Sequence, residues 1–97
     1  MRLPRQRYVL PLQHAAGDMS KKGKRIFEES VVAFDYSENL IVIKTLPGLA
    51  HGVAAAVDSL NWPEIIGTIA GDDTILAVIK EKNKTKFILD KLEELRG

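Results

Sequence analysis

The chain contains no cysteine, and this absence removes two classes of site. Without thiols there is neither a disulfide framework nor a thiolate-bound metal centre. The sequence also lacks any apolar run near the ~20 residues that a membrane span needs, and no apolar segment follows the basic start as it does in a secretory signal. We therefore expect a protein of the reducing cytoplasm with no membrane partner.

The chain is also short, at 97 residues, which limits it to one small domain. A domain of this size buries only about 60–65% of the surface that its unfolded chain exposes. Its apolar content of 45% is ordinary for a globular protein, so a core is expected, but a small one. Assembly with further copies of the chain would add to its stability.

Charge is distributed unevenly along the sequence. The net charge is +1, but residues 1–25 carry seven basic groups and one acidic group, whereas residues 26–97 carry seven basic and twelve acidic groups. A basic arm on an acidic body indicates either an arm that meets polyanions or a solvated tail. Residues 1–29 are predicted to be this arm, with one short strand near residues 8–10 and a helix over residues 20–30 capped by Ser20.

Residues 30–97 read as one α+β domain. Apolar periodicity predicts strands over residues 31–36, 40–45, 64–70 and 74–80. It predicts helices from Pro47 to about Leu60 and over residues 84–96, the latter capped by Asn83 or Thr85 and closed by Gly97. The expected fold is a two-layer β-β-α-β-β-α sandwich, in which a four-stranded, mostly antiparallel sheet carries two helices on one side.

The first of these helices has two distinct faces. At 100° per residue, its apolar stripe toward the core consists of Leu49, Val53, Ala56, Val57 and Leu60. The opposite side carries His51, Ala54, Ala55 and Asp58. His51 and Asp58 are two turns apart, about 10 Å along one face. That face is either packed against another surface or floors a shallow cleft with a polar group at each end.

The adjacent pair Asp72 and Asp73 lies between two apolar runs, at the tip of the second expected hairpin. Gly and Asp are favoured turn residues, so one acidic residue there needs no further explanation. Two neighbouring carboxylates repel each other unless a cation is near. A guanidinium, with its fork of donors, matches such a pair well.

Three other uses of these residues remain open. Two carboxylates with water can hold Mg²⁺, although no further acid lies at ligand spacing. His51 and Asp58 could suggest acid–base catalysis, but at 10 Å they cannot share a proton, and no nucleophile is placed beside His51. We therefore expect no enzyme. The aspartates could also form salt bridges between subunits in a purely structural oligomerisation module.

Three stretches of the sequence carry a family resemblance: residues 42–51 (VIKTLPGLAH), 58–60 (DSL) and 67–75 (GTIAGDDTI). Together they resemble the C-terminal domain of bacterial arginine repressors, and the resemblance covers about residues 30–97. Residues 7–11 (RYVLP) look like the last strand of that family's N-terminal winged-helix domain, where the interdomain linker begins. Trp62, before Pro63, is expected to pack at the corner between helix and strand.

The resemblance implies a homo-oligomer, a trimer or a hexamer of two stacked trimers, that binds L-arginine as a co-repressor where the trimers meet. No metal or organic cofactor is implied. The residues that match the family's ligand site are Asp72 and Asp73, one of which reaches across from the opposing trimer, Asp58 and His51, which line the site, and Thr68 and Ala70, whose main chain contacts the ligand.

The resemblance also implies a role in transcription. The chain would be the L-arginine-sensing, oligomerising domain of an arginine-dependent regulator of arginine metabolism. DNA operators would be bound only through a winged-helix domain that this chain lacks. The chain departs from the family pattern at two positions. His51 stands where several relatives carry Gln. Ala55 stands where some relatives carry Arg, so this chain cannot form a salt bridge from that position when the ligand is absent.

Overall fold

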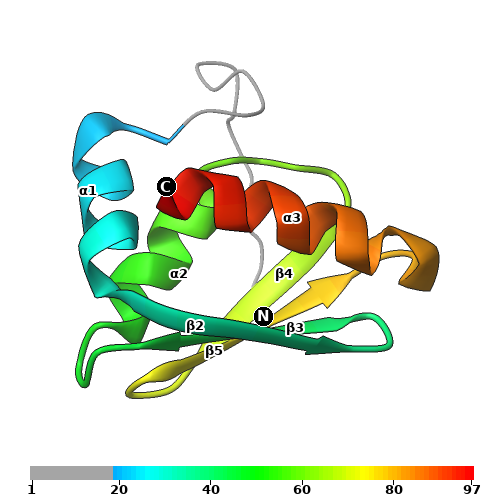
Figure 1. Cartoon of the computed structure of the whole chain (residues 1–97), viewed down its shortest axis with the longest axis horizontal. Coiled ribbons are helices and arrows are strands. Elements are labelled where there is room, and N and C mark those ends of the chain that lie inside the picture. Colours follow the sequence, from blue (N-terminus) through cyan, green and yellow to red (C-terminus); the bar gives the residue numbers. More distant parts are fainter. Residues whose placement is uncertain (1–18) are drawn as a thin grey trace, which may run out of the picture.

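The computed structural model describes residues 19–97, and these form a helix-covered antiparallel sheet (Figure 1). The strands are β2 (Val31–Ser37), β3 (Leu40–Thr45), β4 (Ile65–Ala70) and β5 (Thr74–Ile79). The helices are α1 (Lys21–Ser30), α2 (Ala50–Asp58), α3 (Thr85–Arg96) and the 3-10 turn η2 (Lys82–Lys84). The expected short strand at residues 8–10, the linker and His14 lie outside the described residues.

The sheet has the strand order β2-β3-β5-β4, and every neighbouring pair is antiparallel. In Figure 1 the helices gather on one side of it. Buried strand residues on that side alternate with less buried ones, as in Ile41 and Ile43 of β3 and Ile75 of β5. The predicted two-layer α+β fold is confirmed. Within residues 19–97, no helix is long and apolar enough to cross a bilayer.

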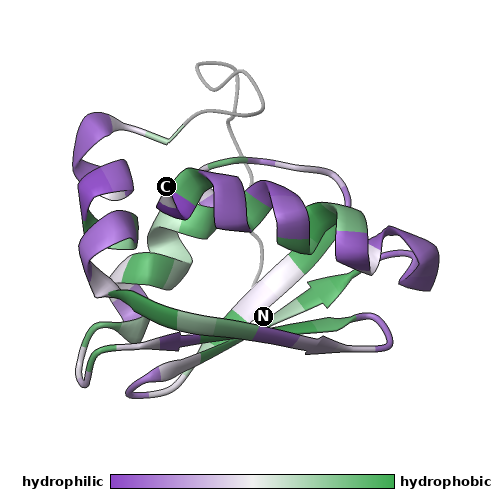
Figure 2. Ribbon diagram, in the orientation of Figure 1, coloured by the Kyte–Doolittle hydropathy of each residue, from purple (hydrophilic) through white to green (hydrophobic). Residues whose placement is uncertain are grey.

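A third helix, α1, also packs into the core. Ser20 caps it as expected, since its hydroxyl oxygen accepts a hydrogen bond from the Gly23 N–H at 3.0 Å. Phe27 is fully buried, with its ring centroid 6.1 Å from that of Phe34 on β2. Figure 2 shows α1 as largely hydrophilic, and it is attached to the core by Phe27 together with the partly buried Ile26. The folded unit thus includes residues of the expected basic arm.

Helix α2 is shorter than the sequence predicts. It begins at Ala50, because Gly48 adopts a left-handed φ of 80° that ends any continuation of the helix toward Pro47. It ends at Asp58, and Asn61 beyond it also has a positive φ, of 54°. The backbone at Gly48 and Asn61 therefore sets the direction of the chain before and after α2.

The face assignment for α2 was wrong at two residues. Leu49 is the N-cap and is 40% exposed, so it lies outside the core stripe. Ala54 is only 7% exposed, because α2 contacts both α1 and strand β4 and buries a wider arc than a helix packed on one side. The remaining stripe residues are buried as predicted: Val53, Ala56, Val57 and Leu60.

The cap of α3 also differs from the prediction. Lys84 occupies the N-cap position, and neither it nor Asn83 caps the helix through a side chain. Thr85 lies one residue inside α3, where its hydroxyl is buried and has no hydrogen-bond partner among the described residues. At the other end, Gly97 closes the helix as predicted, with a φ of 102°.

Candidate functional site

The tip of the β4–β5 hairpin is held by its backbone. The Asp72 carbonyl accepts hydrogen bonds from the N–H groups of Gly48 (3.1 Å) and Ala50 (3.2 Å), and the Asp73 carbonyl accepts one from Thr45 (2.8 Å). These donors end β3 and begin α2, so the tip lies against the N-terminal end of α2. Because the carbonyls carry the anchoring, neither carboxylate is needed to hold the tip in place.

The two carboxylates differ in their surroundings. Both side chains belong to exposed residues. The Thr74 hydroxyl donates a hydrogen bond to Asp73 Oδ1 at 2.9 Å, and the Lys44 ammonium donates to that hydroxyl oxygen at 2.8 Å. Among residues 19–97, neither Asp72 nor Asp73 forms a salt bridge. The tip therefore offers an acidic pair without a directly bonded cation.

A third carboxylate, Asp58, lies at the opposite end of α2. Its Oδ1 accepts a hydrogen bond from the Thr68 hydroxyl of β4 at 3.0 Å. Partial burial raises the pKa of Asp58 above its ordinary value of 3.8, and the Thr68 hydrogen bond opposes this in part. Asp58 is nevertheless an exposed residue, so a ligand can reach its carboxylate while the Thr68 hydroxyl orients it.

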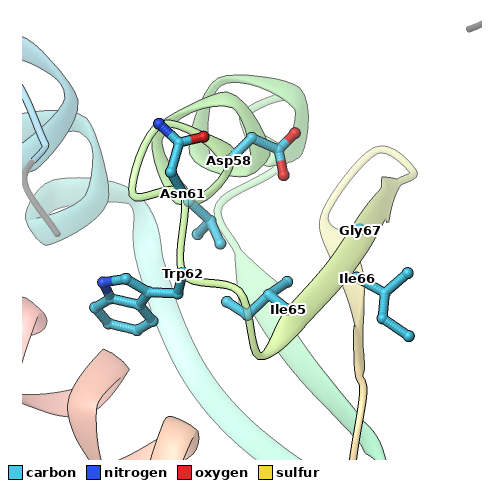
Figure 3. Close-up of a pocket in the computed structure, with 7 residues that line it drawn as sticks. Asp58, Asn61, Trp62, Ile65, Ile66 and Gly67 are labelled. Atoms are coloured by element: carbon cyan, nitrogen blue, oxygen red, sulfur yellow. The ribbon is translucent and has the colours of Figure 1, made fainter. Parts of the chain in front are cut away.

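Asp58 also lines a shallow pocket of about 270 Å³. Figure 3 shows its carboxylate extending from the end of α2 toward β4. The other lining residues are Val57, Asn61, Trp62, Ile65, Ile66 and Gly67. Trp62 is 8% exposed, as expected of a corner packing residue, and the Lys91 ammonium lies 4.1 Å from its ring centroid. The pocket thus combines an acid with apolar walls.

Strand β4 joins the two acidic regions and lies at the edge of the sheet. Its backbone leaves hydrogen-bonding groups unused. The Gly71 N–H bonds to the Thr74 carbonyl, and Ala70 and Thr68 pair with Ile75 and Ala77. In an antiparallel ladder, inward and outward backbone groups alternate along a strand. The N–H and C=O groups of Thr68 and Ala70 therefore point to the free edge, where a ligand can reach them.

The structure brings Asp58 into contact with Thr68 and places His51 near the hairpin tip, at the other end of α2. His51 follows Ala50, which is bonded to the tip, and its side chain is exposed. His51 and Asp58 both lie in α2, about two turns apart. Asp58 contacts Thr68 directly. The six predicted residues thus lie on α2, on β4 and at the hairpin tip, and we refer to this set as the band.

Sequence reasoning missed two contacts. Sequence reasoning assigned only main-chain contacts to Thr68, whereas the Thr68 hydroxyl also donates a hydrogen bond to Asp58. It also gave no role to Lys44 and Thr74. The signal for that pair is the strand register, which places Lys44 opposite Thr74. The pairing of β3 with β5 cannot be predicted from the sequences of these two strands, because a helix and another strand separate them along the chain.

Fold and site define a small two-layer α+β domain that presents an acidic pair on an anchored hairpin, suited to a cationic ligand. Within the described part of the chain, no three His, Cys, Asp or Glu residues gather as metal ligands. Residues 27–94 match the family described as "Arginine repressor, C-terminal domain". The chain belongs to that family, which confirms the resemblance read from the sequence.

Individual relatives agree with the family match. The chain is 53% identical over 88 residues to an arginine repressor of Syntrophomonas wolfei, which covers 91% of this chain and 58% of the relative. It is 48% identical over 91 residues to an arginine repressor of Symbiobacterium thermophilum, covering 94% and 60%. An arginine repressor of Moorella thermoacetica is 56% identical over 72 residues, covering 74% and 48%.

The chain spans at most about three fifths of the length of these relatives. Since they are named as repressors, the family is one of transcriptional regulators and not of enzymes, as the sequence predicts. The whole-protein activities of these relatives are considered for this chain only as proposals.

Proposed function

We propose that this chain senses L-arginine and self-associates, as the oligomerising domain of an arginine-dependent transcriptional regulator of arginine metabolism in the cytoplasm. The observation that carries the proposal is the pair Asp72 and Asp73. Their carbonyls anchor the hairpin tip, and their exposed carboxylates form no salt bridge within residues 19–97. An acidic pair on an anchored hairpin tip favours a ligand that supplies a planar, permanent cation.

Arginine fits the chemistry of the whole band. Its guanidinium offers five donors in a rigid fork and stays charged, so paired carboxylates select it over neutral amino acids. Its α-carboxylate needs N–H donors, which the outward backbone of Thr68 and Ala70 can supply. The Asp58 carboxylate can accept a hydrogen bond from the α-amino group of arginine. His51 adds an exposed polar side chain near the start of α2.

The site is proposed to be complete only in an assembly. The side of the sheet away from the helices carries half-buried and exposed apolar residues; we call it the open sheet face and define it by Leu40, Val42, Ile69, Leu76 and Val78. Ile69 is 69% exposed. A small domain gains much by covering such a face with further copies, as a trimer or a hexamer. A ligand shared between copies then stabilises the assembly by mass action.

Operator binding is assigned to a winged-helix domain and not to the described fold. Residues 19–97 contain no winged helix. We expect this chain alone to bind DNA weakly, through its basic residues, with no preference for an operator sequence. Such binding should fall steeply as salt rises, because it depends on counterion release.

Thermal unfolding with added amino acids tests the sensing role. L-arginine at 100 times its Kd should stabilise the chain by about 2.7 kcal/mol. L-lysine and neutral L-citrulline should stabilise it far less. Asp72→Asn combined with Asp73→Asn should abolish the rise in Tm, whereas Asp90→Asn, a similar change on α3, should leave it intact.

The controls separate the proposal from its rivals. A Tm unmoved by millimolar arginine would reject sensing and leave a purely structural oligomerisation module, in which the aspartates bridge subunits. A rise produced by Mg²⁺ and not by arginine would instead indicate a metal site at the tip.

A further inference from the structure

We infer that Lys44 and Thr74 position Asp73 for its ligand by a relay of two hydrogen bonds, and that they thereby set the affinity of the site for arginine. This inference rests on the proposed function. The relay crosses from β3 to β5, where Lys44 and Thr74 are directly paired, and ends on the carboxylate at the tip. Neither residue need touch the ligand.

The chemistry of the groups fixes the direction of the relay. An ammonium has three donors and no acceptor, so Lys44 can only donate to the Thr74 hydroxyl, at 2.8 Å. The single proton of that hydroxyl is then free to point elsewhere, and Asp73 Oδ1 lies 2.9 Å away as its acceptor. Lys44 therefore directs the Thr74 proton onto Asp73 and holds the carboxylate in one orientation.

The relay makes the two aspartates unequal. One oxygen of Asp73 is engaged by Thr74, which leaves the other for the guanidinium in a preset position. The Asp72 side chain has no side-chain partner among the described residues. Asp73 is thus the fixed member of the pair and Asp72 the adaptable one. Fixing a binding group in advance lowers the entropy lost on binding, which raises affinity.

A second effect of Lys44 has the opposite sign. Its positive charge is separated from the Asp73 carboxylate only by the Thr74 hydroxyl, so it would repel a guanidinium bound to that carboxylate. Lys44 is exposed, so this repulsion is screened by salt within about 10 Å at 0.1 M ionic strength. Orientation by a short hydrogen bond is screened much less. Ionic strength therefore separates the two roles, and the relay predicts that orientation is the larger effect.

Calorimetric titration of L-arginine into the full chain tests the relay. Thr74→Val removes the hydroxyl but keeps the shape of the residue and the charge of Lys44, and it should weaken binding about tenfold, or ~1.4 kcal/mol. Thr74→Ser keeps the hydroxyl and should restore affinity to near that of the unchanged chain. Lys44→Met should also weaken binding, at 0.05 M and at 0.5 M salt alike.

The outcomes distinguish this inference from the proposed function. If the unchanged chain binds arginine and Thr74→Val binds it equally well, the relay is rejected while arginine sensing stands. Tighter binding by Lys44→Met, lost at high salt, would assign Lys44 a repulsive role and also reject the relay. No binding by the unchanged chain would overturn both. The Tm of each ligand-free variant shows that it is folded.

Discussion

Asp58 is the residue at which stability and the proposed ligand binding oppose each other. Because burial raises its pKa, the folded chain binds the Asp58 proton more tightly than the unfolded chain does. The stabilisation that results is full below the unfolded pKa of 3.8 and is lost as the pH rises through the higher, folded pKa. At neutral pH the ionised carboxylate therefore costs stability, and the Thr68 hydrogen bond offsets only part of that cost.

Replacing Asp58 by Asn should therefore stabilise the ligand-free chain at pH 7. Asparagine removes the charge and can still accept from Thr68, so we expect a small rise in Tm that disappears near pH 3. The affinity of the same variant for arginine should fall, because stability and ligand binding often make opposite demands on a residue of a binding site. Thermal melts across this pH range provide the measurement.

The matched change Asp90→Asn is expected to act in the opposite direction. Asp90 forms an exposed salt bridge with Lys86 at 2.7 Å on α3, so its removal should lower stability slightly at pH 7. A fall in Tm for Asp58→Asn at pH 7, of the same sign as for Asp90→Asn, would contradict this account of Asp58.

Single residues of the candidate site can be singled out from the sequence where local chemistry marks them. Asp72 and Asp73 stand out as adjacent charges in a turn, and His51 and Asp58 follow from helical spacing. Thr68, as a partner of Asp58, does not stand out, because that contact depends on how closely α2 approaches β4. The same holds for Lys44 and Thr74, which meet only once β3 and β5 are paired.

At the scale of elements, the site depends on the segment between β3 and α2. Gly48 bonds to the Asp72 carbonyl while its φ is 80°, a conformation that residues with a Cβ adopt at a cost. No atom lies within 4 Å of a Cβ built there, so strain and not crowding would decide a substitution. The turn at Gly48 thus supports the hairpin tip from outside the hairpin.

Gly48→Ala should lower the stability of the chain by about 1 kcal/mol, or Tm by about 4–8 °C. It should also weaken arginine binding, because the tip loses part of its anchor. Gly52→Ala, within α2, is the matched control. That residue has no positive φ, and a Cβ there would make ordinary contact with Ile26 at 3.7 Å, so helix propensity should stabilise it by about 0.5–1 kcal/mol. Equal effects of the two changes in calorimetry would contradict this account.

The elements themselves were largely predictable, and their ends were less so. Strand β3 matches its expected range because β-branched residues fill it and turns bound it. Helix α2 starts three residues later than Pro47 suggests, since the Asp72 carbonyl recruits the Gly48 and Ala50 N–H groups. Leu49 and Ala54 were misplaced because a helical wheel assumes one packing surface, whereas α2 has neighbours on two sides.

At the scale of the whole molecule, helices cover one side of the sheet, and nothing within residues 19–97 covers the other. Helices α2 and α3 contact the strands on one side (Figure 1), and the open sheet face bears the apolar residues named above. An uncovered apolar sheet face in a domain this small favours assembly. Sequence periodicity predicted the sheet, because alternating apolar residues mark each strand.

Sedimentation velocity should give a trimer or hexamer for the unchanged chain, with the larger species favoured by L-arginine. Ile69→Lys places a charge on the open sheet face and should shift the chain to smaller species at the same concentration. Because Ile69 is 69% exposed, circular dichroism should show an unaltered fold. Phe87→Lys, at a residue 52% exposed on α3, is the control and should leave assembly unchanged. A monomer at every concentration of the unchanged chain would refute assembly.

The central claim is that Asp72 and Asp73 form half of an arginine site that a second copy completes. A crystal structure grown with saturating L-arginine tests it most directly. We expect the guanidinium between the two carboxylates of the tip, with a carboxylate from a neighbouring copy also in contact. A tip whose aspartates bind only protein cations of a neighbouring copy, with arginine absent, would contradict the claim.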